Sequence, residues 1–390
     1  MKLAARMSRI SVSGTMIVSE KAIQLRDAGV DLVDFGAGEP DFPTPENIKQ
    51  AGIRAIESNF TRYTAIGGLR ELRAAIVDQH ARELGSKYEV SECIVNAGGK
   101  HAIFNICSAL VDEGDEVIIP TPYWVSFADI ARFVGATTVF VHTQEDDGFR
   151  LTAGMLEKAI TPRTRMLIVN SPSNPSGAVI DDEEFVRIAQ LCRRHNICLL
   201  TDECYARFLY DGRRPFSIAS QAEFKDTVVI AGSLSKTYAM TGWRIGYVLG
   251  PKLVIDAIHK LQSHSTSNPN SIAQKAALEA VTGPQESVRQ MLGEYEKRRR
   301  FVIDRLRAMP GLQCAEPGGA FYAYPNISSS FSREIRDSMD FSVRLLEKVH
   351  VAVVPGAAFG TTDHVRISYA TSMEQLDKGL TRIANFMSSI

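Results

Sequence analysis

One lysine, Lys236, stands in a setting that suits covalent chemistry. An apolar run at 227–231, typical of a buried strand, comes shortly before it. Ser233 and Ser235 precede the lysine, and Arg244 follows it eight residues later. Serine hydroxyls and a guanidinium group are suited to holding a phosphate. This combination predicts a reactive amine beside a phosphate site.

The amine of Lys236 must lose its proton before it can act as a nucleophile. Burial and nearby positive charge both lower the pKa of a lysine toward that state. An amine that forms a Schiff base next to a phosphate points to an aldehyde cofactor, pyridoxal 5'-phosphate. A lysine in a Gly/Ser loop is more often a solvated surface residue, so the hypothesis depends on the rest of the chain.

The composition is that of an ordinary globular enzyme. The chain has 390 residues, of which 45% are hydrophobic and 23% charged, with a formal net charge of −1. This length predicts two domains, or one large domain with an appendage. The charge provides no basic field for nucleic acid, and we expect no membrane span and no secretory signal.

The cysteines and histidines lack metal-binding spacing. Six cysteines form no CxxC pair, and eight histidines show no HExxH motif. We therefore expect reduced thiols, a cytoplasmic protein and no metal.

Apolar runs alternate with helical patterns through the middle of the chain. Runs of this kind suit strands that are buried on both faces of a mostly parallel sheet. The predicted strands are 94–97, 116–120, 137–142, 166–170, 197–201, 228–231 and 245–249. The pattern predicts an α/β fold with a large, doubly wound, seven-stranded sheet domain.

The alternation of predicted strands and helices ends at Pro251. Helical periodicity extends to about residue 309, and a smaller α+β domain follows, with short strands near 320–325, 351–354 and 365–369 and a last helix from Met373. We assign residues 1–46 to an N-terminal arm and part of the small domain, 47–285 to the large cofactor-binding domain and 286–390 to the small C-terminal domain. Near the first boundary, Thr44 is the expected N-cap of a helix with Pro45 in its first turn.

Polar residues follow several of the predicted strands. Ligands in such sheets bind beyond the carboxyl ends of the strands. Gly98, Gly99 and Lys100 begin a helix, where free backbone N–H groups can meet a phosphate, although Gly-Gly alone is often just a turn. Asn174 lies in a loop that could present a donor to an aromatic oxygen or could be a plain Asn-Pro turn. Asp202 follows a buried strand and needs a cationic partner, for which a protonated pyridine nitrogen would serve.

An arginine in the last predicted strand could bind a substrate. Arg366 alternates with apolar residues, and a guanidinium is the natural receptor for a carboxylate. Without the polar loops described above, the expected role of Arg366 would be a structural ion pair.

Together these motifs resemble the class I aminotransferases of pyridoxal-phosphate fold type I, from about residue 10 to the end. Within that family the chain is similar to the bacterial aspartate aminotransferases of the I-beta kind. The matching motifs are Gly36-Ala-Gly-Glu-Pro-Asp41, Arg62-Tyr-Thr64, Gly98-Gly-Lys100, Pro122-Tyr-Trp-Val-Ser126, Ser171-Pro-Ser-Asn-Pro175, Asp202-Glu203, the lysine segment, Gly318-Gly-Ala-Phe321 and Arg366-Ile-Ser-Tyr-Ala370.

The resemblance implies a role for each residue near the cofactor ring. Lys236 would form the Schiff base and then move a proton, so that it is catalytic together with Asp202 and Tyr205. Asp202 would pair with the pyridine nitrogen, and Asn174 and Tyr205 would bond the phenolic oxygen. Trp124 would stack on the ring, with its neighbour Tyr123 as an alternative.

The resemblance also implies a phosphate site that two subunits share. Tyr63 from a second subunit would help to hold the phosphate, so we expect a homodimer. The other expected phosphate ligands are Gly99, Lys100 through its backbone, Ser233, Ser235 and Arg244.

The substrates implied are amino acids and 2-oxo acids. Gly38 and Arg366 would hold the α-carboxylate, together with Trp124 and Asn174 beside it. Aspartate aminotransferases of the animal type bind the side-chain carboxylate with an arginine from the segment after the lysine motif. In this chain that segment, residues 261–270, contains no arginine. By the resemblance, Lys100 and Thr15 would bind the side-chain carboxylate instead. We expect transfer of the amino group from L-aspartate to 2-oxoglutarate.

Other functions remain open at this point. A fold type I β-lyase or an aminotransferase for prephenate or aromatic substrates would use the same cofactor. A transcriptional sensor would need a DNA-binding module, for which residues 1–46 are too short and insufficiently basic. A Rossmann dehydrogenase is disfavoured because Gly36-Ala-Gly38 does not continue as GxGxxG.

Overall fold

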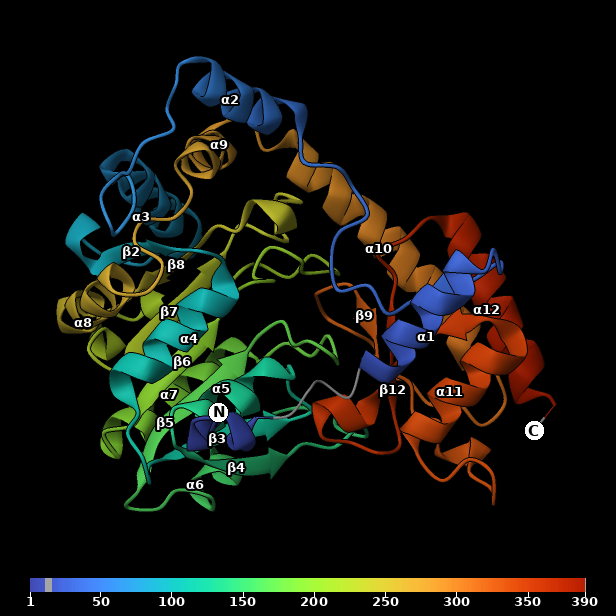
Figure 1. Ribbon diagram of the computed structural model, residues 1–390. Helices are drawn as coiled ribbons and strands as arrows, with labels where there is room; N and C mark the ends of the chain where they lie inside the picture. Colours follow the sequence, from blue (N-terminus) through green and yellow to red (C-terminus); the bar gives the residue numbers. More distant parts are fainter. Residues whose placement is uncertain (11–15, 390) are drawn as a thin grey trace.

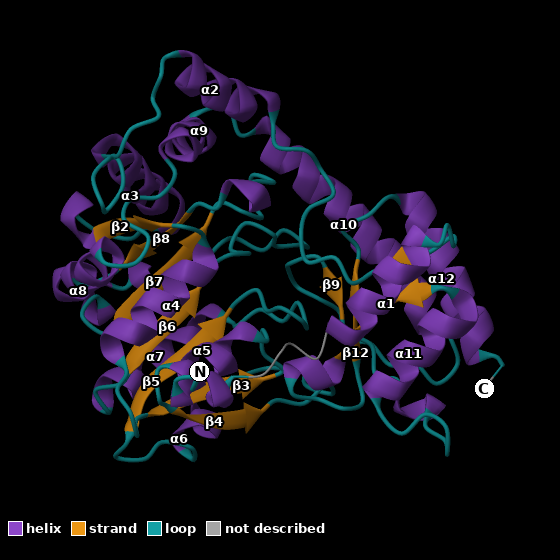
Figure 2. Ribbon diagram, viewed as in Figure 1, coloured by secondary structure: helices purple, strands orange, loops and turns teal. Residues whose placement is uncertain are grey.

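A seven-stranded sheet forms the centre of the larger part of the molecule (Figures 1 and 2). The computed structural model describes residues 1–10 and 16–389. The strands are β2 (Cys93–Asn96), β3 (Glu116–Thr121), β4 (Thr137–His142), β5 (Thr164–Asn170), β6 (Cys198–Asp202), β7 (Val228–Ser233) and β8 (Gly246–Leu249). All seven predicted strands are confirmed, with ends within two residues of the predicted ones.

The order of the strands is β2-β8-β7-β6-β5-β3-β4. β8 runs antiparallel to both of its neighbours, and every other adjacent pair is parallel. The carboxyl ends of β5, β6 and β7 therefore lie along one edge of the sheet. β2 ends at that edge and β8 begins there. The predicted α/β class with a mostly parallel sheet is confirmed.

Helices cover both faces of this sheet. One face packs against α4 (Gly99–Leu110), α5 (Ser126–Phe133) and α8 (Lys252–Ser263), and the other against α3 (Arg70–Leu84) and α7 (Asp182–Arg194), with α6 (Ala153–Glu157) beside α7. Along β3, Val117 and Ile119 pack into the hydrophobic core on the α4 side of the sheet. Ile118, between them, packs into the core on the α3 side. Because both faces are buried, the strands read as continuous apolar runs.

A smaller unit lies at the other end of the long helix α10 (Glu286–Arg307), which crosses the molecule diagonally in Figure 1. Its short strands pair as β1 (Val33–Asp34) with β10 (Val351–Ala352), and as β11 (Val354–Pro355), β12 (Val365–Ser368) and β9 (Tyr322–Ala323). Three helices pack around them: α1 (Met16–Asp27), α11 (Ser338–Val349) and α12 (Met373–Met387). The predicted short strands and the last helix are confirmed, while the boundaries at 46 and 285 remain predictions.

The remaining helices, α2 (Glu46–Glu57) and α9 (Ser271–Thr282), pack against each other at the top of Figure 1. The N-cap of α2 is Pro45, so the expected cap by Thr44 is wrong by one residue. The Thr44 hydroxyl is instead engaged elsewhere: it donates to the Ala239 carbonyl at 2.5 Å and accepts from Trp243 Nε1 at 3.0 Å. These two bonds tie the start of α2 to the loop that contains Lys236.

All six cysteines are free thiols. In the part of the chain that the structure describes, no helix has the length and apolar character needed to cross a membrane.

Candidate active site

A cavity of about 360 Å³ lies where the carboxyl ends of the central strands face the smaller unit. Of the fourteen site residues predicted from the sequence, twelve line this cavity. They are Gly38, Gly99, Lys100, Trp124, Asn174, Asp202, Tyr205, Ser233, Ser235, Lys236, Arg244 and Arg366. Segments far apart in the sequence therefore meet at one site.

One side of the cavity is a cradle of glycines and hydroxyls at the start of α4. Gly98 has a φ of 98°, and a Cβ there would lie 2.3 Å from Nη2 of Arg244. A Cβ on Gly246 would lie 2.4 Å from the Gly99 nitrogen. Because these positions lack side chains, three kinds of hydrogen-bond donor come together: the Arg244 guanidinium, the Ser233 hydroxyl and the first N–H groups of α4. This set of donors is suited to binding a phosphate.

Lys236 lies in the loop after β7 and projects its amine across the cavity. Its Nζ donates to the carbonyl oxygen of Gly38. Burial lowers the pKa of Lys236, and the positive charges of Arg366 and Arg244 lower it further against the opposing effect of Cys204 and Glu39. The geometry thus favours the free amine that nucleophilic chemistry requires.

Asp202 ends β6 and is buried. Its Oδ1 accepts a hydrogen bond from the Cys204 N–H at 3.0 Å, and no cationic side chain lies within ion-pair distance of its carboxylate among the described residues. Burial raises the pKa of Asp202 to about 7. A carboxylate in this state fits a cationic group of a bound cofactor.

Arg366 enters the cavity from β12. Its Nη1 donates to Oδ1 of Asn174 at 3.0 Å and its Nη2 to the Gly36 carbonyl at 2.8 Å. The guanidinium group lies over the ring of Tyr322, with Cζ 4.5 Å from the ring centroid, and its buried Nε has no hydrogen-bond partner among the described residues. These contacts hold a positive charge rigidly at the cavity wall.

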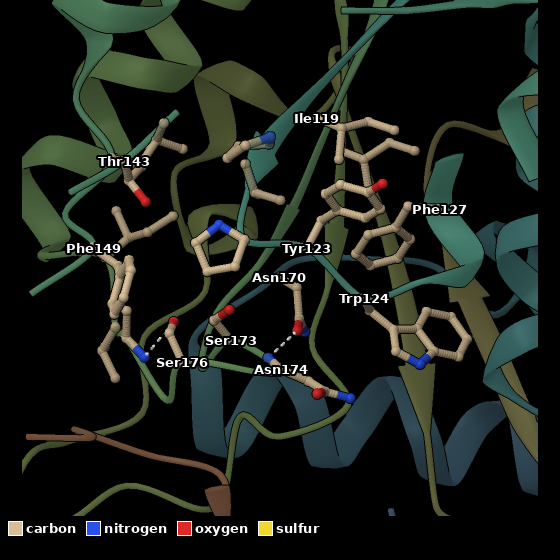
Figure 3. A pocket seen from close by; sticks show the side chains of 18 residues that line it. Ile119, Tyr123, Trp124, Phe127, Thr143, Phe149, Asn170, Ser173, Asn174 and Ser176 are labelled. Carbon is tan, nitrogen blue, oxygen red and sulfur yellow. Dashed lines mark hydrogen bonds between the residues drawn. The ribbon is translucent and has the colours of Figure 1, made fainter. Parts of the chain in front are cut away.

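The aromatic pair Tyr123 and Trp124 separates into two environments. Trp124 lines the main cavity, whereas Tyr123 stacks on Phe140 with a centroid distance of 5.1 Å and an interplanar angle of 15°. Figure 3 shows both rings at a neighbouring cavity of about 50 Å³, with the indole turned away from the phenol. Only Trp124 of the pair is therefore available to a ligand in the main cavity.

Two predicted residues lie outside this group. Tyr63 is 91% exposed and does not line the cavity. Thr15 lies outside the described residues. Lys100 does line the cavity, and its Nζ lies 5.0 Å from the centroid of the Trp124 ring.

Sequence reasoning missed several residues that shape the cavity. Asn170, the last residue of β5, accepts a hydrogen bond from the Asn174 N–H at 2.8 Å (Figure 3). It also donates to the Asp202 carbonyl at 3.0 Å, so it joins two loops of the site. An asparagine that ends a buried apolar run was an available signal. Val354, Phe359 and Cys204 also line the cavity, but their residue types gave no signal.

The cavity fits pyridoxal phosphate in its chemistry. It offers a phosphate cradle in which glycines leave room for the Arg244 guanidinium and the Ser233 hydroxyl, an amine of lowered pKa, and a buried carboxylate that has no cationic partner among the described residues. In the described parts of the chain, no three His, Cys, Asp or Glu side chains are grouped so that they could hold a metal ion.

Comparison with known proteins identifies the family. The family model for aminotransferase class I and II matches residues 30–383. The chain belongs to this family. An aspartate aminotransferase of Geobacillus stearothermophilus is 45% identical over 99% of both chains, and an aspartate/prephenate aminotransferase of Nitrosomonas europaea is 43% identical over the full length of both.

Solved structures agree with this assignment. The aspartate aminotransferase of Rhizobium meliloti has a TM-score of 0.95 at 42% identity and covers 100% of this chain and 99% of its own. The Thermus thermophilus aspartate aminotransferase with maleate has a TM-score of 0.93 at 42% identity, with 99% of each chain covered. The protein is thus an aminotransferase of fold type I, and its cofactor is pyridoxal phosphate.

Proposed function

We propose that this aminotransferase transfers the amino group of L-aspartate to 2-oxoglutarate, giving oxaloacetate and L-glutamate in two successive half-reactions. The observation that carries the proposal is the single cavity that is lined by the Lys236 amine, the buried Asp202 carboxylate and the Arg366 guanidinium. The names of the relatives support aspartate, and the maleate of the Thermus structure is a four-carbon dicarboxylate, as aspartate is.

We assign the cofactor site to residues of the large unit. The phosphate would be held by Gly99, the Lys100 backbone, Ser233, Ser235 and Arg244, and the ring by Trp124, Asn174, Tyr205 and Asp202. When bound, pyridoxal phosphate supplies an electron sink for the pair of electrons left at the substrate Cα. Asp202 would keep that sink effective by holding its negative charge against the ring nitrogen.

Lys236 would act as the general acid and base of the reaction. Its Nζ would accept the proton from the substrate Cα and deliver a proton to C4′ of the cofactor, and in the second half-reaction it would move a proton in the opposite direction. The lowered pKa of this lysine suits the role because only the free amine can accept a proton. The Gly38 carbonyl, which accepts a hydrogen bond from Nζ, would hold the amine in place.

The two carboxylates of the substrate would be bound at different walls of the cavity. Arg366 would bind the α-carboxylate, next to Gly38, with its orientation fixed by Asn174. Lys100 would bind the side-chain carboxylate from the start of α4, together with Thr15. This arrangement would favour dicarboxylic amino acids.

A substrate screen tests the proposal. The holoenzyme is incubated with single amino acids and 2-oxoglutarate, and the oxo acids, L-glutamate and ammonia are measured. We expect oxaloacetate and L-glutamate in equal amounts from L-aspartate, without ammonia. Release of ammonia would indicate a β-lyase, and a reaction with aromatic substrates only would make the aspartate assignment wrong.

A second candidate activity is transfer to prephenate. It is favoured by the Nitrosomonas relative, which is named for both aspartate and prephenate. The same screen with prephenate as amino acceptor distinguishes a dual-substrate enzyme from one restricted to aspartate.

We further propose a cytoplasmic homodimer with shared active sites. The exposed Tyr63 would complete the phosphate site of the other subunit, and the six free thiols suit a reducing compartment. Light scattering should give about twice the chain mass of 42.9 kDa. A mass of one chain would contradict the shared site.

A further inference from the structure

We propose that Tyr322 is a positioning residue that directs the hydroxyl proton of Tyr205 into the cavity and at the same time supports Arg366. This inference rests on the proposed function, in which Tyr205 donates to the phenolic oxygen of the cofactor. It assigns a role to a residue of the smaller unit that does not itself line the cavity.

Tyr322 contacts Tyr205 and Arg366 and lies close to Gly38, three residues that line the cavity. It belongs to β9 and pairs with Ser368 of β12, two residues beyond Arg366. Its side chain is fully buried, and its ring lies under the Arg366 guanidinium at 4.5 Å. Its hydroxyl lies 2.8 Å from the Tyr205 hydroxyl and 3.7 Å from the place where a Cβ on Gly38 would stand.

The two phenols have only two protons between them, and the Tyr205–Tyr322 hydrogen bond uses one of these. Each hydroxyl has one proton to donate, and either oxygen can accept. Burial raises the pKa of both phenols, so both protons are present at neutral pH. One proton is used between the two rings, and the other must point elsewhere.

Only one of the two phenols faces the cavity. Tyr205 lines it and Tyr322 does not. If Tyr205 donated to Tyr322, the Tyr205 proton would point away from the cavity. A cofactor oxygen in the cavity would then meet only the lone pairs of the Tyr205 oxygen. When Tyr322 donates to Tyr205, the Tyr205 proton is free for the cofactor oxygen. The bond that Tyr205 then accepts from Tyr322 also polarises the Tyr205 hydroxyl and makes it a stronger donor, and Tyr322→Phe removes this polarisation.

The ring and the hydroxyl of Tyr322 serve different partners. The ring packs against the Arg366 guanidinium, whose Cζ also lies 5.2 Å from the centroid of the Phe359 ring. The hydroxyl bonds only Tyr205 among the described residues. Tyr322→Phe thus removes the proton and leaves the support of Arg366 in place.

The test is the pH titration of the visible absorption of the cofactor in the holoenzyme. A donor to the phenolic oxygen stabilises its anionic form, so weakening the donor should make the oxygen more basic. We expect Tyr322→Phe to raise the titration midpoint by roughly 0.5 to 1 pH unit, in the same direction as Tyr205→Phe. The double variant should shift no further than Tyr205→Phe alone, because the two hydroxyls act as one unit.

A matched control is Tyr369→Phe. Tyr369 is also a fully buried phenol of the smaller unit, but its hydroxyl bonds the Ala320 carbonyl at 3.3 Å, away from the cavity. This variant should leave the midpoint unchanged. Inhibition by maleate should be the same in wild type and Tyr322→Phe, since Arg366 keeps its ring contact.

Different failures have different meanings. If Tyr205→Phe shifts the midpoint and Tyr322→Phe does not, Tyr322 has no positioning role and the proposed function stands. If neither variant shifts the midpoint, the proposed role of Tyr205 is wrong as well. Additive shifts in the double variant would show that Tyr322 acts independently of Tyr205 and would overturn the coupling.

Discussion

Among single residues, Asp202 shows how burial changes the titration of a carboxyl group that would pair with the cofactor. It is held at the end of a buried strand, and burial raises its pKa to about 7 from an ordinary value of 3.8. In the folded protein without cofactor, the carboxyl group therefore binds a proton that the unfolded chain has already lost between these pH values. Stability must fall as the pH rises through this range.

We predict that Asp202→Asn stabilises the cofactor-free protein at pH 8 and leaves its stability nearly unchanged at pH 4. The amide cannot ionise, so it avoids a cost of roughly 4 kcal/mol that the buried carboxylate incurs above its folded pKa. Urea unfolding of both proteins across this pH range measures the difference. A gain that is independent of pH would mean that Asp202 is not the titrating group.

The same replacement should impair the holoenzyme. An amide carries no negative charge to hold the cofactor nitrogen in its cationic form, so transamination should slow although the cofactor-free protein is more stable. Equal rates for wild type and Asp202→Asn would remove Asp202 from the mechanism.

At the scale of elements, the junction of β2 and α4 depends on glycines where backbones and side chains crowd together. Any Cβ at Gly98 would meet the Arg244 guanidinium, and the φ of 98° is itself unfavourable for other residues. The phosphate cradle is therefore a property of the loop geometry as much as of its polar side chains.

We predict that Gly98→Ala weakens the binding of pyridoxal phosphate at least tenfold. Its control is Gly114→Ala, which has a similar φ of 93° but no atom within 4 Å of the added methyl group. Both variants should lose about 1 kcal/mol of stability or more from backbone strain, but only the first displaces Arg244. Titration of the cofactor-free proteins with pyridoxal phosphate gives the two affinities, and equal values would contradict the assigned cradle.

Much of the fold could be predicted because the central strands are buried on both sides. A strand such as β3 has no polar face, so its apolar run stands out in the sequence. The reversal of β8 against β7 was not predictable, since it depends on which edges pair in three dimensions. The cap of α2 was mispredicted because Thr44 bonds a loop that is distant in sequence.

The site was predictable where it follows strand ends. Parallel strands bring residues such as Asn174, Asp202 and Lys236 to one edge of the sheet, and their polar types after apolar runs are visible in the sequence. Tyr322 was not predictable, because it contacts Tyr205 only when the two units pack together.

At the scale of the whole molecule, His364 joins the two units. Its Nδ1 lies 2.8 Å from Oδ1 of Asp363, and its Nε2 lies 3.3 Å from Oε2 of Glu145, in the loop after β4. The ring stacks on Tyr324 at 4.8 Å. Burial alone would lower the pKa of His364, but the hydrogen bonds and charges of the two carboxylates outweigh burial and raise it.

We predict that this ion pair stabilises the protein in acid more than in base. A histidine with a raised pKa contributes its full stability below the unfolded pKa of 6.5 and loses it as the pH rises through the folded pKa. The unfolding free energy lost in His364→Gln should thus be larger at pH 5.5 than at pH 9. Glu145→Gln should show the same dependence, and a loss equal at both pH values would exclude the charged pair.

Single-turnover product analysis measures whether Lys236 performs amino transfer from L-aspartate in two half-reactions. Holoenzyme given L-aspartate alone should release one equivalent of oxaloacetate per subunit. After removal of free substrate, 2-oxoglutarate should then yield one equivalent of L-glutamate, and Lys236→Ala should yield neither product. Normal yields from Lys236→Ala, or ammonia in place of L-glutamate from the wild type, would exclude amino transfer by Lys236.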